Sequence, residues 1–98
     1  MKYELGRDTT VIGVELEEGR SVIVTRPCIM GGVATHTIDS RYNETQITHW
    51  LRNRMMRNVQ PMVQDAFPDM KAEDREFLMT GITPAKWNEM FPKEEGQD

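Results

Sequence analysis

The sequence predicts an α+β fold, with an N-terminal antiparallel meander of three or four strands followed by three or four helices. Residues 1–39 alternate apolar and polar side chains between glycine-containing turns, which is typical of antiparallel strands. Residues 43–67 place apolar side chains at helical spacing, and residues 69–91 contain a helix stop and a helix start. We expect one helix to pack on the sheet, because a sheet this small needs one face covered.

Two turns divide the first 39 residues into strands. Gly19, within residues 17–20, can take positive φ in the first turn, and Gly31-Gly32 forms the second. Pro27 marks a strand end, a sheet edge or a bulge, because it has no N–H to donate to a neighbouring strand. The expected strands cover residues 11–16, 21–25 and 33–38, with residues 3–5 as a fourth strand in the larger version of the sheet.

The central segment, residues 43–67, predicts a helix with one apolar face. Asn43 and Gln46 have the spacing of a capping box at its start. Pro61 removes one helical hydrogen bond, so we expect a kink or a break near Gln60. The apolar positions at helical spacing are Ile47, Trp50, Leu51, Met55, Val59, Met62, Val63, Ala66 and Phe67.

The last structured segment, residues 69–91, predicts two helices joined by a tight corner. Gly81 can end the first helix in the left-handed conformation, with Ile82 folding back on the last turn in a Schellman-type ending. Thr83 can cap the second helix, and Pro84 suits its first position. If the two helices fold against each other, one cluster forms from Phe77, Leu78, Ile82, Trp87, Met90 and Phe91.

Length and composition predict one small domain over residues 1–92, with a mobile tail at residues 93–98. A chain of 98 residues buries roughly 60–65% of its unfolded surface and has no room for a deep cavity. Cys28 is the only cysteine, so an intrachain disulfide is excluded and a reducing compartment is favoured. The sequence shows no signal peptide and no apolar run of membrane-spanning length. We therefore expect a cytoplasmic protein with no membrane contact.

Charge is unevenly distributed along the chain, whose net charge is −4. Residues 1–39 carry four basic and six acidic side chains, residues 40–64 carry four arginines and one glutamate, and residues 65–98 carry four basic and nine acidic side chains. A basic middle thus lies between acidic ends. The overall acidity argues against general nucleic-acid binding, which depends on neutralising phosphates.

The residues that could carry catalysis or hold a metal do not form a recognised pattern. Cys28, His36 and Asp39 are the residue types of a Cys–His–acid site, but no nucleophile motif surrounds them. Cys28, His36 and His49 lack the spacing of a metal-binding set. We therefore expect no catalytic residue, no metal and no cofactor.

The arginines of the middle segment are the candidate partner-binding residues. We assign Arg41, Arg54, Met56 and Arg57 to this surface. Met56 is included because a helix cannot turn both Met55 and Met56 into one narrow apolar stripe. Arg54 and Arg57 fall on one helical face, whereas Arg52 points away and could pair with a C-terminal acid. Three alternatives stay open: solvated or internally paired arginines, a contact surface for an acidic partner, and a nucleic-acid site that also uses Trp50.

The segment REFLMTGITPAKWNEMFP, residues 75–92, resembles the C-terminal segment of small, mostly uncharacterised phage proteins, including those of gokushovirus-like phages. Those proteins carry a DREFLMTGITP run, here Asp74–Pro84, followed by a Trp and a Phe, here Trp87 and Phe91. The match covers about a quarter of the chain. This chain departs from those proteins at two places. Lys71 stands where a Ser or Thr helix cap is usual, which moves the expected cap to Asp69. Lys86 and Asn88 replace the usual acidic residues after the proline.

The resemblance implies a phage origin and no particular activity. With the lack of a catalytic pattern, it favours a non-enzymatic phage protein that binds a host or viral protein in the host cytoplasm. The alternatives are a nucleic-acid-binding accessory protein that uses residues 41–57 and a virion structural or scaffolding protein. Homodimerisation through Met56, or through a free edge strand, is a further hypothesis.

Overall fold

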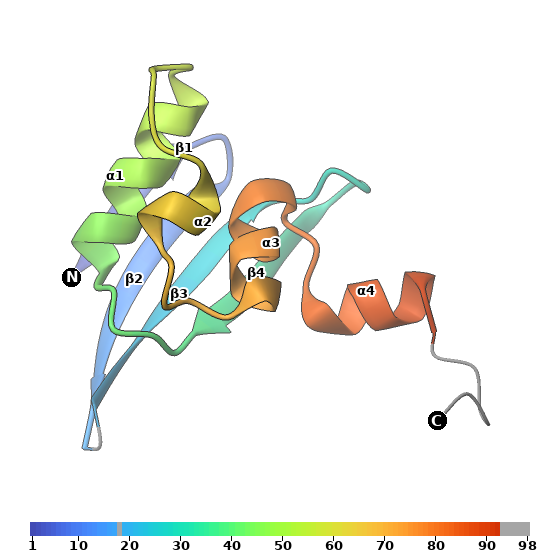
Figure 1. The fold of residues 1–98 in the computed structure, drawn as a ribbon, viewed down its shortest axis with the longest axis horizontal. Coiled ribbons are helices and arrows are strands. Elements are labelled where there is room, and N and C mark those ends of the chain that lie inside the picture. The colour runs from blue at the N-terminus through green and yellow to red at the C-terminus, as the bar shows by residue number, and fades with distance from the viewer. Residues whose placement is uncertain (18, 93–98) are drawn as a thin grey trace.

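In a computed structural model that describes residues 1–17 and 19–92, the chain has a four-stranded antiparallel sheet followed by four helices (Figure 1). The α+β class and the fourth strand are confirmed. The tail predicted at residues 93–98 lies outside the described residues. The elements are β1 (Lys2–Gly6), β2 (Thr9–Leu16), β3 (Gly19–Pro27), β4 (Val33–Ile38), α1 (Glu44–Met55), α2 (Val63–Ala66), α3 (Ala72–Thr80) and α4 (Pro84–Met90).

The sheet is a simple meander, in which the strands lie in chain order β1-β2-β3-β4. Both predicted glycine turns are confirmed, since Gly19, Gly31 and Gly32 have positive φ. The register places Val11 opposite Val24, and Val24 opposite His36. These three side chains therefore lie in one row across the sheet, on the face that the helices cover.

The hydrophobic core lies between this face and the helices α1, α2 and α3 (Figure 1). The Phe67 ring packs edge-on against Tyr42 and Trp50, at centroid distances of 4.9 and 6.1 Å. The Trp50 indole N–H donates to the Pro61 carbonyl at 3.0 Å, so Trp50 is a core residue with its polar atom satisfied. The buried core comprises Val11, Val22, Val24, Ile38, Tyr42, Ile47, Trp50, Leu51, Val63, Phe67, Met70, Phe77 and Leu78.

Helix α1 begins as the sequence predicts and ends earlier. Asn43 and Gln46 form the capping box, with both hydrogen bonds at 2.9 Å. The predicted break is present, but the helix already ends at Met55 and the next one begins at Val63. The connecting segment folds back along α1, where the Pro61 carbonyl meets the Trp50 indole. Val59, expected on the apolar face, is consequently fully exposed.

The corner between α3 and α4 follows most of the local predictions. Gly81 is left-handed with φ +78°, and Thr83 caps α4 by accepting from the Lys86 N–H at 3.1 Å. The Schellman-type ending is wrong, because the Ile82 N–H donates to the Thr80 hydroxyl at 3.1 Å. The expected cap at Asp69 is also wrong, because α3 starts after Lys71, which makes no side-chain cap bond.

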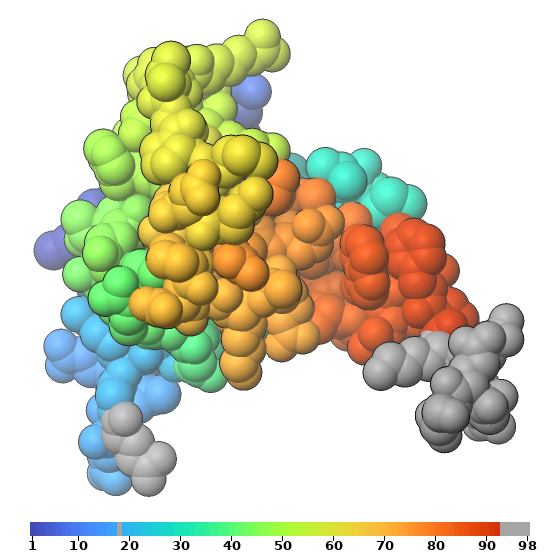
Figure 2. Space-filling model, in the orientation of Figure 1, coloured from blue at the N-terminus to red at the C-terminus, as the bar shows by residue number. Residues whose placement is uncertain are grey.

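Helix α4 lies outside the core, which contradicts the single aromatic cluster expected from the sequence. Phe77, Leu78 and Ile82 are buried, but α4 buries no residue, and Trp87 is 44% exposed. Trp87 packs instead on Phe91, with ring centroids 4.9 Å apart. Ile82 is buried, whereas the short α4 forms a separate lobe (Figure 2).

Candidate functional site

The four candidate partner-binding residues do not share one surface. Arg41 precedes α1, whereas Arg54, Met56 and Arg57 lie at its C-terminal end. A helix of 12 residues is about 18 Å long, so Arg41 is separated from the other three by the whole of α1. Met56 and Arg57 are exposed, and Arg54 lies over the Trp50 ring with its guanidinium carbon 5.6 Å from the centroid.

Arg41 is an internally paired arginine. Its Nε donates to Asp69 Oδ2 at 2.6 Å, and its guanidinium lies 4.8 Å from the Tyr42 ring centroid. Hydrogen bonding to Tyr42 first, and to Asp69 second, raises the pKa of Arg41 above its ordinary value. Arg41 thus fits the paired alternative. Arg52, by contrast, is exposed and makes no ion pair with any residue in 1–17 or 19–92.

The histidine and the acid of the Cys–His–acid set have separate partners, and Cys28 is a half-buried free thiol. His36 Nε2 donates to Asp74 Oδ1 at 2.6 Å, and its ring packs on Phe77 at 5.2 Å. Asp39 accepts from the Ser21 hydroxyl. The His36–Asp74 pair therefore ties β4 to α3, and sequence reasoning missed it because the two residues are far apart in the chain. Over the described ranges, no three His, Cys, Asp or Glu side chains are placed to share a metal ion.

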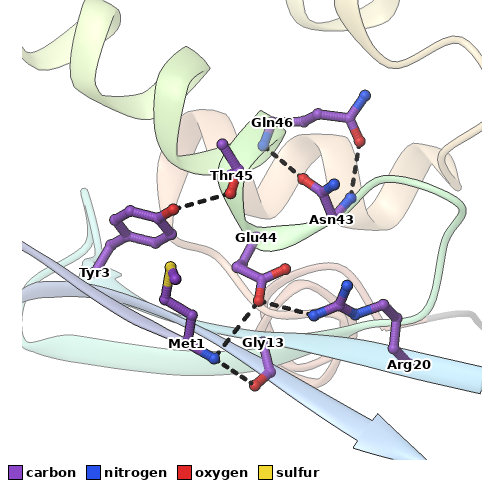
Figure 3. A network of polar contacts seen from close by, with 8 residues as sticks. All are labelled: Met1, Tyr3, Gly13, Arg20, Asn43, Glu44, Thr45 and Gln46. Carbon is purple, nitrogen blue, oxygen red and sulfur yellow. Dashed lines mark hydrogen bonds and ion pairs between the residues drawn. The ribbon is translucent and has the colours of Figure 1, made fainter.

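A buried carboxylate joins α1 to the sheet (Figure 3). The Glu44 side chain is only 6% exposed, and its Oε2 lies 2.9 Å from Arg20 Nη2 and 3.6 Å from the Met1 amine. Gly13 lies directly beneath it, since the nearest heavy atoms to a Cβ built there all belong to Glu44. The sequence signal for this contact is a glycine in the middle of a strand, which marks a close approach. This network fixes the N-terminal end of α1 on the sheet.

An open groove lies between α3 and α4, with a volume of about 360 Å³. Its apolar part includes Trp87 and the buried Ile82. Glu73 and Glu76 add two carboxylates from α3, and neither forms an ion pair with a residue that the structure describes. The residues that line the groove are Ala72, Glu73, Glu76, Ile82, Thr83, Pro84, Trp87 and Asn88.

The groove combines an exposed aromatic ring with unpaired negative charge. No lysine or arginine lines it, and Lys86 on α4 is directed to Glu89 at 3.7 Å. Such a surface can hold a basic group against an aromatic face, which is a favourable cation–π arrangement.

No protein-family model, curated protein or solved structure matches this chain. The phage resemblance of residues 74–91 therefore stays a prediction. In the structure, this segment forms most of α3, the Gly81 corner and α4. Hence the residues that carry the resemblance include most of the groove lining. Of the helices in residues 1–17 and 19–92, none has the length and apolar character required to cross a bilayer.

Proposed function

We propose that this chain is a non-enzymatic binding protein whose α3–α4 groove docks a basic, amphipathic segment of a partner protein. The observation that carries the proposal is the exposure of Trp87 beside Glu73 and Glu76. Adjacent exposed apolar side chains, here Trp87 packed on Phe91, are more typical of interaction sites than single exposed residues are, and Trp is enriched among residues that dominate binding energy. Since α4 buries no residue in the core, a role in partner contact accounts for the exposed rings of Trp87 and the adjoining Phe91.

Charge complementarity selects the kind of partner. The groove carries two carboxylates and no basic side chain, so a lysine or arginine of the partner gains both an ion pair and a face of Trp87. An apolar neighbour of that basic residue would meet Ile82 and Pro84. A basic partner for the groove differs from the acidic partner considered for the arginines of the middle segment. Those arginines do not form one surface, because they are divided between the two ends of α1.

The phage resemblance favours a host or viral protein as the partner in the host cytoplasm. Self-association is the alternative for the same protein-binding role, because β1 and β4 are both open edges of the described sheet. Light scattering at micromolar concentrations distinguishes the two: a monomer mass supports a foreign partner, and a dimer mass supports self-association. The nucleic-acid alternative relied on Arg41, Arg54 and Arg57 acting together, and these arginines are divided between the two ends of α1.

The proposal is tested by selecting displayed random peptides on the wild-type protein. Selected peptides are expected to combine basic and apolar residues. Trp87→Ala should weaken their binding roughly 30-fold, since truncating a central aromatic anchor typically costs 2 kcal/mol or more. Fluorescence anisotropy with labelled peptides gives the dissociation constants. Val59→Ala is the control, because Val59 is fully exposed and lies outside the groove.

A charge variant tests the acidic half of the groove separately. Glu73→Gln combined with Glu76→Gln should weaken binding and flatten its dependence on salt, because exposed charge pairs are screened by ions. Peptides that bind the Trp87→Ala protein as tightly as the wild type would refute the proposed groove. So would a selected set that is acidic or uncharged.

A further inference from the structure

A second cavity, of about 270 Å³, is lined by three arginines from three different elements. Arg7 comes from the β1–β2 turn, Arg26 from β3 and Arg54 from α1. These residues are far apart in the sequence, so no local pattern predicts that they meet. Thr9, Pro27, Leu51 and Met55 complete the lining.

Two of the arginines are held in place by the end of α3. Arg26 Nη1 donates to the Leu78 carbonyl at 2.6 Å, and its Nε donates to the Pro27 carbonyl at 2.9 Å. Arg54 Nη2 donates to the Met79 carbonyl at 3.3 Å. Each guanidinium has five N–H donors in a fixed plane, so both keep donors that these contacts do not use.

Capping of α3 explains only part of this arrangement. Positive side chains are favourable at a helix C-terminus, which accounts for Arg26 and Arg54 near the α3 carbonyls. It does not account for Arg7, whose guanidinium makes no hydrogen bond or ion pair with any residue the structure describes. The third arginine therefore adds positive charge to the cavity without a partner of its own.

The positive charge of the cavity is not balanced by its lining. No aspartate or glutamate lines it, and none of its three arginines forms an ion pair within residues 1–17 and 19–92. Burial first, and the charge of Arg54 second, lower the pKa of Arg26. The apolar side chains of Leu51 and Met55 lower the local dielectric constant. A lower dielectric constant strengthens both the repulsion between the arginines and their attraction to an anion.

We infer that the cavity between Arg7, Arg26 and Arg54 is a binding site for a phosphate-type oxyanion, either inorganic phosphate or a phosphomonoester group. Planar guanidinium groups match the oxygens of phosphate in a two-pronged geometry, and a dianion offsets more of the clustered charge than a monoanion. The Thr9 hydroxyl, also on the cavity wall, donates to the Arg7 carbonyl at 3.3 Å and so helps to hold the turn that carries Arg7. The site shares no residue with the α3–α4 groove, so the two proposals stand or fall separately.

The test is a titration of the full chain with sodium phosphate, in which amide NMR spectra are recorded at each concentration. A titration with sodium chloride at matched ionic strength is the reference. Phosphate should give saturable shifts in the amides of Arg7, Thr9 and Met55, and chloride should not. Arg7→Gln should weaken the phosphate affinity about tenfold, the usual effect of losing one charge-assisted hydrogen bond. Arg7 is chosen because its side chain holds no other part of the fold.

Arg52→Gln removes the same charge from an exposed site outside the cavity and should leave phosphate affinity unchanged. Glycerol phosphate and dimethyl phosphate then separate the ligand sources. Binding of the monoester as well as inorganic phosphate assigns the site to phosphorylated groups, and binding of inorganic phosphate alone assigns it to the free anion. Unsaturable shifts, an unchanged affinity in Arg7→Gln, or equally tight binding of the diester monoanion would each overturn the inference.

Discussion

Replacing Gly81 with alanine is expected to lower the free energy of unfolding by about 3 kcal/mol, from the left-handed strain and the overpacking together. The residue has φ +78°, a conformation that alanine adopts only with strain. An added Cβ would also lie 2.4 Å from the Pro27 carbonyl oxygen and 2.8 Å from Cys28 Cα. Both atoms belong to the backbone, so the neighbours cannot rotate away. Urea unfolding followed by circular dichroism measures the loss.

Gly32→Ala is the matched control for this prediction. Gly32 has φ +73°, but an added Cβ would have no heavy atom within 4 Å. The control therefore carries the left-handed strain without the clash, and it should cost about 1–2 kcal/mol. Equal losses at the two positions would show that the chain does not pass closely over Gly81. A larger loss at Gly81 supports the contact that also joins the Ile29 N–H to the Thr80 carbonyl at 2.9 Å.

The features that the sequence predicted correctly are those encoded within a few neighbouring residues. The capping box of Asn43 and Gln46, and the corner at Gly81, Thr83 and Pro84, depend on side chains that act on adjacent backbone. The glycine turns and the alternation of the strands are local in the same sense. These signals were sufficient to predict the α+β class and the order of the elements.

The features that the sequence did not predict depend on where elements meet. Apolar spacing marked Trp87 as a core residue, but α4 buries no residue and Trp87 is 44% exposed. Arg41 was grouped with Arg54 by composition, yet the length of α1 separates them. The groove and the arginine cavity could not be predicted, because each is built from segments whose relative position only the fold determines.

The close approach of Gly13 and Glu44 leads to a second stability prediction. The effect of Gly13→Ala on the free energy of unfolding should change sign when Glu44 is also replaced. In the wild-type chain, Gly13→Ala places a Cβ 2.0 Å from Glu44 Oε2, so the carboxylate must move away from Arg20. Disturbing a buried ion pair and overpacking the site should together cost about 2 kcal/mol. The half-exposed Arg20 can find water, which keeps the loss below that of a fully buried pair.

In a Glu44→Ala background, the same Gly13→Ala change should instead stabilise the protein by about 0.5 kcal/mol, because alanine restricts the unfolded chain at a position where φ is not left-handed. The three heavy atoms nearest the added Cβ all belong to Glu44, so removing that side chain removes the nearest obstacle. A double-mutant cycle from urea unfolding should therefore give a coupling energy of about 2.5 kcal/mol. Coupling near zero would mean that Gly13 is required by some other part of the sheet, and that α1 is not positioned by Glu44.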